Sequence, residues 1–208
     1  MDERLGSARL YFVVEADASD ALLDAALRGG VDLLQLRDKD STDDELLRAA
    51  ERFRAACDRH DALFVLNDRP ELALACGADG VHVGQDDLPV ADVRRLVGPD
   101  VVIGLSTHSV DEFDAGLESE ADYLSAGPIW ETPTKAGRPA TGLELIRHAA
   151  RAATKPFFAI GGIDESTVDE VVAAGAGRIV VVRAIRDAGD PEAAARRLRT
   201  AAEAAHVA

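Results

Sequence analysis

Short apolar runs recur along the chain and alternate with stretches in which the apolar residues have helical spacing. The runs are mostly continuous, which is typical of parallel strands covered on both faces. They predict strands near residues 10–14, 33–36, 63–66, 80–83, 101–105, 123–126, 157–160 and 179–182. The alternation of these eight strands with helices favours an α/β fold of one closed (βα)8 TIM barrel over an open sheet.

Local signals support the helices between these strands. Thr42 and Glu45 have the spacing of a capping box and predict a helix start. Pro89 suits the first turn of another helix, and Asp190 followed by Pro191 is expected to open the last helix.

An internal repeat points to the same architecture. Similar segments beginning at Gly29, Cys76, Ser119 and Ala174 each join a helix end to a strand start. They recur at roughly 45 to 55 residues, which is the length of two βα units. Four such repeats predict eight strands.

Composition limits the classes of protein to consider. The 208 residues contain no linker or low-complexity stretch, which predicts one domain over 1–208 with its core at about 10–199. The opening residues match neither a secretion signal nor a membrane span. Cys57 and Cys76 are expected to be reduced core thiols, as in a cytoplasmic protein. The net charge of -15 argues against nucleic acid as a partner, and a homo-oligomer stays open.

Polar signatures follow the predicted strands, where each apolar run ends. Parallel strands in a barrel bring their carboxyl ends to one face, and barrel enzymes carry their chemistry on that face. The signatures are QLRDK (35–39), NDR (67–69), GQDD (84–87), GLSTH (104–108), GPIWETPTK (127–135) and AIGGI (159–163).

Acidic residues in two neighbouring signatures suggest a metal ion. Asp68 follows the third strand, and Asp86 and Asp87 follow the fourth. Two carboxylates completed by substrate phosphate oxygens and water are a usual arrangement for Mg²⁺. A helix-capping role for Asp68 and Asp87 is the alternative, and the pattern does not choose between Asp86 and Asp87.

The cations are placed to favour an anionic substrate. Only three lysines stand against twenty arginines, yet Lys39 and Lys135 both fall in the signatures. Chance placement of the lysines and a rim ion pair between Arg37 and Asp38 are the structural alternatives. His108 could act as an acid or base but has no evident partner, whereas His82 fits a packed position better.

Two other segments fit a phosphate group. The long segment after the sixth strand carries Thr132, Thr134 and Lys135 as donors. The Gly161–Gly162 turn and the turn after the eighth strand lie where barrels of this kind bind phosphate through backbone N–H groups.

Taken together in this order, the signatures resemble the thiamine phosphate synthase family, also called thiamine-phosphate pyrophosphorylase. The resemblance runs from Leu10 to about Arg199. It implies a TIM-barrel transferase of thiamine biosynthesis that joins hydroxymethylpyrimidine diphosphate to a thiazole phosphate, or to its carboxylated tautomer. The products are thiamine phosphate and pyrophosphate, and Mg²⁺ is the cofactor.

The resemblance also implies roles for individual residues. The pyrimidine diphosphate would be bound by Gln35, Leu36, Arg37, Asp38, Lys39, Asn67, Ser106 and Lys135. Within this set Arg37, Lys39, Ser106 and Lys135 would be catalytic. Asp68 and Asp87 would hold Mg²⁺. The thiazole phosphate would be bound by Thr132, Pro133, Thr134, Gly162, Val182 and Arg183.

One position departs from the family pattern. After the valine of the eighth strand the family usually has a small hydroxyl residue, whereas this chain has Arg183. Two rival functions are a thiazole tautomerase of the same superfamily, with His108 as acid and base, and a non-catalytic sensor of thiazole or thiamine phosphate. The tautomerase predicts loss of the diphosphate and metal residues, all of which are present here.

Overall fold

The protein is a closed barrel of parallel strands surrounded by helices, as the computed structural model shows for residues 3–132 and 139–204. The strands are β1 (Leu10–Val14), β2 (Leu33–Leu36), β3 (Leu63–Asn67), β4 (Gly80–Val83), β5 (Val102–Thr107), β6 (Tyr123–Ala126), β7 (Phe157–Ile160) and β8 (Ile179–Val181). They pair in chain order, and β8 pairs with β1 to close the ring. The TIM-barrel prediction is confirmed.

The helices follow the predicted alternation. They are α1 (Glu3–Ser7), α2 (Asp20–Arg28), α3 (Asp43–His60), α4 (Pro70–Ala75), α5 (Val90–Val97), α6 (Val110–Glu118), α7 (Gly142–Ala152), α8 (Val168–Ala173), α9 (Arg183–Arg186) and α10 (Pro191–Ala204). The capping box of Thr42 and Glu45 is present at the start of α3. Pro89 stands at the N-cap of α5, one position before the predicted first turn. Pro191 opens α10 as expected.

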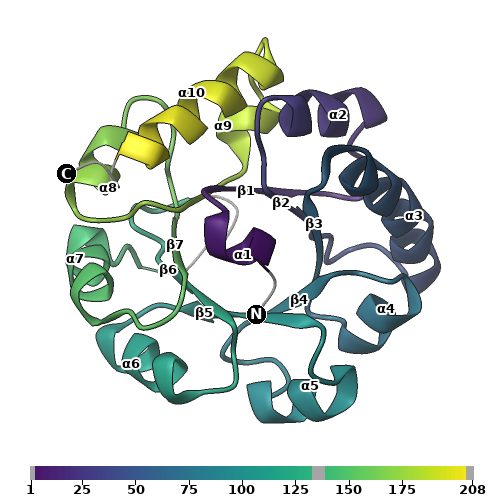
Figure 1. The fold of residues 1–208 in the computed structure, drawn as a ribbon, viewed down its shortest axis with the longest axis horizontal. Helices are drawn as coiled ribbons and strands as arrows, with labels where there is room; N and C mark the ends of the chain where they lie inside the picture. The colour runs from purple at the N-terminus through teal and green to yellow at the C-terminus, as the bar shows by residue number, and fades with distance from the viewer. Residues whose placement is uncertain (1–2, 133–138, 205–208) are drawn as a thin grey trace.

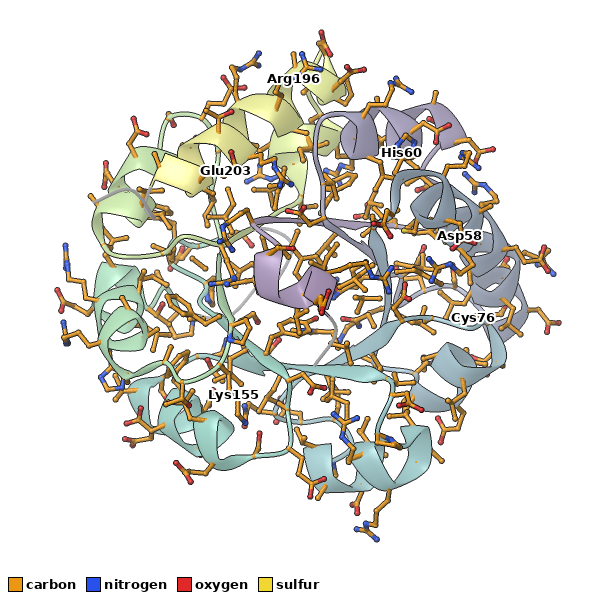
Figure 2. All side chains as sticks on the ribbon, in the orientation of Figure 1. Asp58, His60, Cys76, Lys155, Arg196 and Glu203 are labelled. Carbon is orange, nitrogen blue, oxygen red and sulfur yellow. The ribbon has the colours of Figure 1, made fainter. Side chains whose placement is uncertain are left out.

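Strand residues separate into two layers by alternation. In β1, Leu10, Phe12 and Val14 pack against the helices, while Tyr11 and Val13 belong to the cluster inside the barrel. The outer layer is the larger core, and Figure 1 shows its helices surrounding the strands. Figure 2 labels exposed side chains on the outside of these helices, among them Asp58 of α3 and Arg196 of α10.

The short helix α1 lies across the centre of the ring in Figure 1. Its Leu5 is fully buried in the cluster inside the barrel. The guanidinium of Arg178, which directly precedes β8, donates to the carbonyl of Gly6 at 2.9 Å. This helix therefore covers the amino-terminal end of the barrel.

The internal repeat is visible as a repeated acidic residue at that same end. Asp32, Asp79 and Asp122 directly precede β2, β4 and β6. Each accepts a hydrogen bond from a backbone N–H at the start of the preceding strand, at 3.0 Å from Leu10, 2.8 Å from Phe64 and 2.8 Å from Ile103. Each also pairs with at least one arginine. In the fourth repeat the equivalent position is the cation Arg178.

Four strand boundaries differ from the prediction, among them the end of β3, which includes Asn67, and the start of β5, which lies at Val102. β5 continues through Thr107, because Ser106 and Thr107 stay in register with Ser125 and Ala126 of β6. β8 ends at Val181, because Val182 leaves the strand conformation and caps α9. Ser106 is therefore a buried strand residue.

Two observations concern composition. Cys57 and Cys76 are free thiols, and burial raises the pKa of Cys57 to about 12. Through 3–132 and 139–204 we find no helix with the length and apolar character that crossing a membrane requires.

Candidate active site

A cavity of about 300 Å³ opens at the carboxyl ends of the strands. Residues of all eight strands, or of the loops that follow them, contribute to its wall. Among the residues predicted for the site, the cavity is lined by Gln35, Arg37, Asn67, Ser106, Thr132, Gly162, Val182 and Arg183. The fold thus gathers polar groups from distant parts of the sequence around one space.

The alternation along β2 decides which residues of QLRDK face the cavity. Gln35 and Arg37, two positions apart and therefore on the same side of the chain, both line it. The side chain of Leu36 points the other way and is fully buried in the core between strands and helices. Only the backbone of Leu36 could therefore face a ligand.

Asp38 organises the loop that follows β2. Its carboxylate accepts from the backbone N–H groups of Asp40 at 3.1 Å, Ser41 at 3.2 Å and Ala16 at 3.3 Å. Partial burial raises the pKa of Asp38, but these hydrogen bonds outweigh it and lower the pKa overall. The carboxylate holds the loops after β1 and β2 together, and no ion pair with Arg37 is found in the described chain.

Asp68 and Asp87 face each other beside the cavity. Burial of Asp68, followed by the charge of Asp87 and a hydrogen bond with it, raises the pKa of Asp68. Lys39 approaches the Asp68 carboxylate at 3.8 Å, and its charge acts in the opposite direction. The backbone N–H of Gly84 donates to Asp87 at 2.7 Å and fixes that carboxylate. The pair is a concentration of negative charge that a cation would relieve.

The far end of the cavity is built from two turns. Gly161 and Gly162 follow β7 with φ of 104° and 76°, values that favour glycine. A Cβ on Gly161 would also lie 2.5 Å from Cα of Pro128, so the close approach excludes a side chain there. Val182 and Arg183, after β8, complete this end.

Two acidic residues also line this end of the cavity and were not predicted. Asp164 Oδ1 accepts from the backbone N–H and the hydroxyl of Ser166, at 2.8 and 2.6 Å. The pKa of Asp187 is lowered, chiefly by its hydrogen bond with Arg186, and the charge of Arg183 adds to that effect. Both carboxylates therefore already have local partners.

The floor of the cavity holds polar side chains that the sequence reasoning missed. Tyr11, His82 and Ser125 line it together with Ser106. They lie inside apolar strand runs, so periodicity alone assigned them to the core. The available signal was alternation, because Tyr11 shares the inner face of β1 with Val13.

Three predicted residues, Pro133, Thr134 and Lys135, lie outside the described residues. His108 is not among the described residues of the cavity wall, but its Nδ1 bonds to the carbonyl of Gly127, which lines the cavity.

Comparison with known proteins decides the family. A family model described as thiamine monophosphate synthase matches residues 10–185. The chain is 52% identical over 201 residues to the thiamine-phosphate synthase of Acidothermus cellulolyticus, covering 94% of this chain and 95% of that protein. The chain belongs to the thiamine monophosphate synthase family.

Other relatives of this family agree in sequence and structure. The thiamine-phosphate synthase of Mycolicibacterium smegmatis is 49% identical over 217 residues, covering 98% of this chain and 96% of that protein. The solved thiamine phosphate pyrophosphorylase of Pyrococcus furiosus matches with a TM-score of 0.88 at 30% identity, covering 98% of this chain and 99% of that chain. This chain is accordingly an enzyme, a transferase.

The carboxylate pair fits the cation that thiamine monophosphate synthases generally use, Mg²⁺. Two facing carboxylates, one with a raised pKa, are a set of hard oxygen donors, the type of ligand that Mg²⁺ prefers. Within 3–132 and 139–204 no group of three or more His, Cys, Asp or Glu residues gathers as a metal cluster. A Mg²⁺ ion at Asp68 and Asp87 would therefore need further oxygen ligands from substrate or water.

Proposed function

We propose that this chain is a thiamine-phosphate synthase, which joins a hydroxymethylpyrimidine diphosphate to a thiazole phosphate or its carboxylated tautomer. The observation that carries the proposal is one cavity with two ends of different character. Beside one end stand Asp68, Asp87, Arg37 and Lys39, and at the other are the glycine turn and Arg183.

The first end suits the diphosphate. Asp68 and Asp87 would hold Mg²⁺, which when bound neutralises charge on the phosphate oxygens. Arg37 and Lys39 would stabilise the negative charge that grows on the pyrophosphate as it leaves, together with Lys135. Asn67 and Gln35, which line the cavity, would orient the pyrimidine ring and its diphosphate.

The second end suits a monophosphate. The turn at Gly162, with Val182, would offer backbone N–H groups to the phosphate of the thiazole. Arg183 would add a guanidinium where the family usually has a hydroxyl residue. Thr132 lines the cavity between the two ends. With Pro133 and Thr134 it would contribute further contacts to the thiazole phosphate.

The chemistry then needs positioning more than a protein nucleophile. Loss of pyrophosphate leaves a positive charge on the methylene carbon of the pyrimidine, and the pyrimidine amino group can delocalise this charge. The thiazole nitrogen then attacks the methylene carbon. Holding both reactants in one water-poor space is a large part of such catalysis. A tautomerase would use His108 as acid and base and would not need the diphosphate and metal residues, all of which are present here.

The test is pyrophosphate release from the purified chain with both substrates, with and without Mg²⁺. We expect release only when both substrates and Mg²⁺ are present. Conversion of the thiazole alone would make the chain a tautomerase, and binding of thiazole phosphate without turnover would make it a sensor.

The metal ligands are tested by a matched pair of variants. Asp87→Asn should raise the Mg²⁺ concentration needed for half-maximal turnover at least 10-fold, because it removes a charged ligand. Asp86→Asn is the control and should change it less than 3-fold. Equal effects of the two substitutions would mean that Asp87 is the wrong choice of ligand.

A further inference from the structure

A chain of buried hydrogen bonds crosses the inside of the barrel beneath the cavity. Gln35 Nε2 donates to the hydroxyl of Tyr11, which lies 2.9 Å from the hydroxyl of Tyr123. That hydroxyl lies 2.9 Å from His82 Nδ1, and His82 Nε2 lies 2.9 Å from Ser106 Oγ. All five side chains are buried, and all of them except Tyr123 line the cavity.

The donors and acceptors along this series of hydrogen bonds can be assigned, because each group has a fixed number of protons to donate. Gln35 Nε2 can only donate, so the Tyr11 oxygen accepts from it and keeps one proton to give. A buried hydroxyl group almost always donates its proton to a hydrogen bond. The hydroxyl of Tyr11 therefore donates to Tyr123, and the hydroxyl of Tyr123 donates to His82 Nδ1. His82 then carries its own proton on Nε2 and donates it to Ser106.

Burial keeps the two phenols neutral. It raises the pKa of Tyr11 and that of Tyr123 well above their ordinary values. At neutral pH both hydroxyls therefore retain the protons that this series of hydrogen bonds requires.

Gly104 leaves space for the hydrogen bond between Tyr123 and His82. On β5 it is in register with His82 of β4 on one side and Tyr123 of β6 on the other. A Cβ at Gly104 would collide with the Tyr123 hydroxyl and with His82 Nδ1. The missing side chain leaves the space through which two non-adjacent strands form their hydrogen bond.

We propose that Tyr11, Tyr123 and His82 are positioning residues, which hold His82 in the Nε2–H tautomer and thereby orient the Ser106 hydroxyl. With its oxygen accepting from His82, Ser106 gives its own proton in another direction. The consequence for turnover rests on the proposed function, in which Ser106 contacts the pyrimidine diphosphate. The tautomer of His82 does not rest on it.

The first experiment measures the tautomer in the substrate-free protein by ¹⁵N NMR of the imidazole rings. His82→Gln identifies the His82 signals by their loss. We expect a protonated Nε2 and an unprotonated Nδ1. A protonated Nδ1, or a ring protonated on both nitrogens at neutral pH, would overturn the proposal even if the chain proves to be a synthase.

The second experiment breaks the chain at two places and compares a packing control. Tyr123→Phe removes the donor to His82, so we expect mixed tautomers and a fall in kcat of roughly 10-fold to 100-fold, with the KM for thiazole phosphate unchanged. Tyr11→Phe leaves the Tyr123 hydroxyl in place and should reduce kcat less than 5-fold.

Phe158→Leu is the control, because Phe158 packs edge-on against both tyrosine rings without a hydrogen-bonding group. It should lower the melting temperature but leave the tautomer unchanged and kcat within about 2-fold. An equal loss of kcat in Phe158→Leu and Tyr123→Phe would assign the effect to packing and overturn the proposal. Wild-type kcat in Tyr123→Phe would overturn it as well.

Discussion

Two aspartates at opposite rims of the barrel have different surroundings. At the amino-terminal rim Asp79 pairs with Arg54 at 2.5 Å and accepts from the backbone N–H of Phe64 at 2.8 Å. At the carboxyl-terminal rim Asp68 faces the carboxylate of Asp87. Asp79 thus has its charge balanced by cations, whereas Asp68 has Lys39 at 3.8 Å and a second carboxylate facing it. A carboxylate paired with cations stabilises the fold, whereas two carboxylates held close together favour the binding of a cation. The contrast separates structural from functional aspartates without any knowledge of the reaction.

The largest effect should come from the opposed pair. Asp68→Asn removes one of two proposed charged metal ligands, and we expect turnover to fall by about 100-fold or more. Steady-state pyrophosphate release at saturating substrates measures this. A loss below about 3-fold would show that Asp68 takes no part in the reaction.

The same variant should gain stability when no metal is present. Because the pKa of Asp68 is raised in the folded protein, its contribution to stability is present at low pH and is lost as the pH rises through the folded pKa. Asparagine carries no charge, so metal-free Asp68→Asn should melt about 1–3 °C above wild type at neutral pH. This difference in melting temperature should vanish in acid. A variant that melts below wild type at neutral pH would contradict repulsion between Asp68 and Asp87.

At the other rim the expected result is reversed. Asp79→Asn weakens its pairs with Arg54 and Arg4 and its hold on the start of β3. We expect a loss of about 2–3 kcal/mol in the free energy of unfolding, measured with urea, because one partner of a partly buried ion pair is removed. The kcat of the folded fraction should stay within about 2-fold, and a selective loss of activity would contradict a structural role.

Arg183 should give a smaller effect, confined to one substrate. Arg183→Ser restores the small hydroxyl that the family usually has. We expect the KM for thiazole phosphate to rise about 5-fold to 10-fold and its dependence on salt to weaken, with kcat nearly unchanged. If Arg183 instead points to solvent, neither quantity will change.

The smallest effect is expected at Arg178, the repeat position where a cation replaces aspartate. Burial, followed by the charge of Arg9, lowers the pKa of Arg178, so its charge is unfavourably placed. Arg178→Met removes that charge together with the hydrogen bond to Gly6, and these changes oppose each other. We expect unfolding free energy within about 0.5 kcal/mol of wild type, in contrast to Asp79→Asn.

The sequence predicted the barrel because most strands are apolar runs and six of the eight lead into a polar signature. It located the cavity residues that follow those runs, such as Arg37 and Asn67. It missed Tyr11 and Tyr123, because the sequence does not show which group a tyrosine hydroxyl inside an apolar run will bond. Their partners come from other strands, and only the closed ring brings those together.

The sequence pattern also did not predict the hydrogen-bond partners of the Asp38 carboxylate. Its spacing allowed an ion pair with Arg37, whereas its carboxylate accepts three backbone N–H groups, one of them from the loop after β1. Such contacts depend on the paths of two loops, which composition and periodicity do not determine.

The bond between Arg178 and Gly6 joins residues near opposite ends of the sequence, as does the bond from the N–H of Ile179 to the carbonyl of Arg9. During synthesis on a ribosome, Arg178 emerges 172 residues after Gly6. The ring cannot close until β8 has left the exit tunnel. Until then β1 has an unpaired edge, which makes the nascent chain dependent on protection from aggregation.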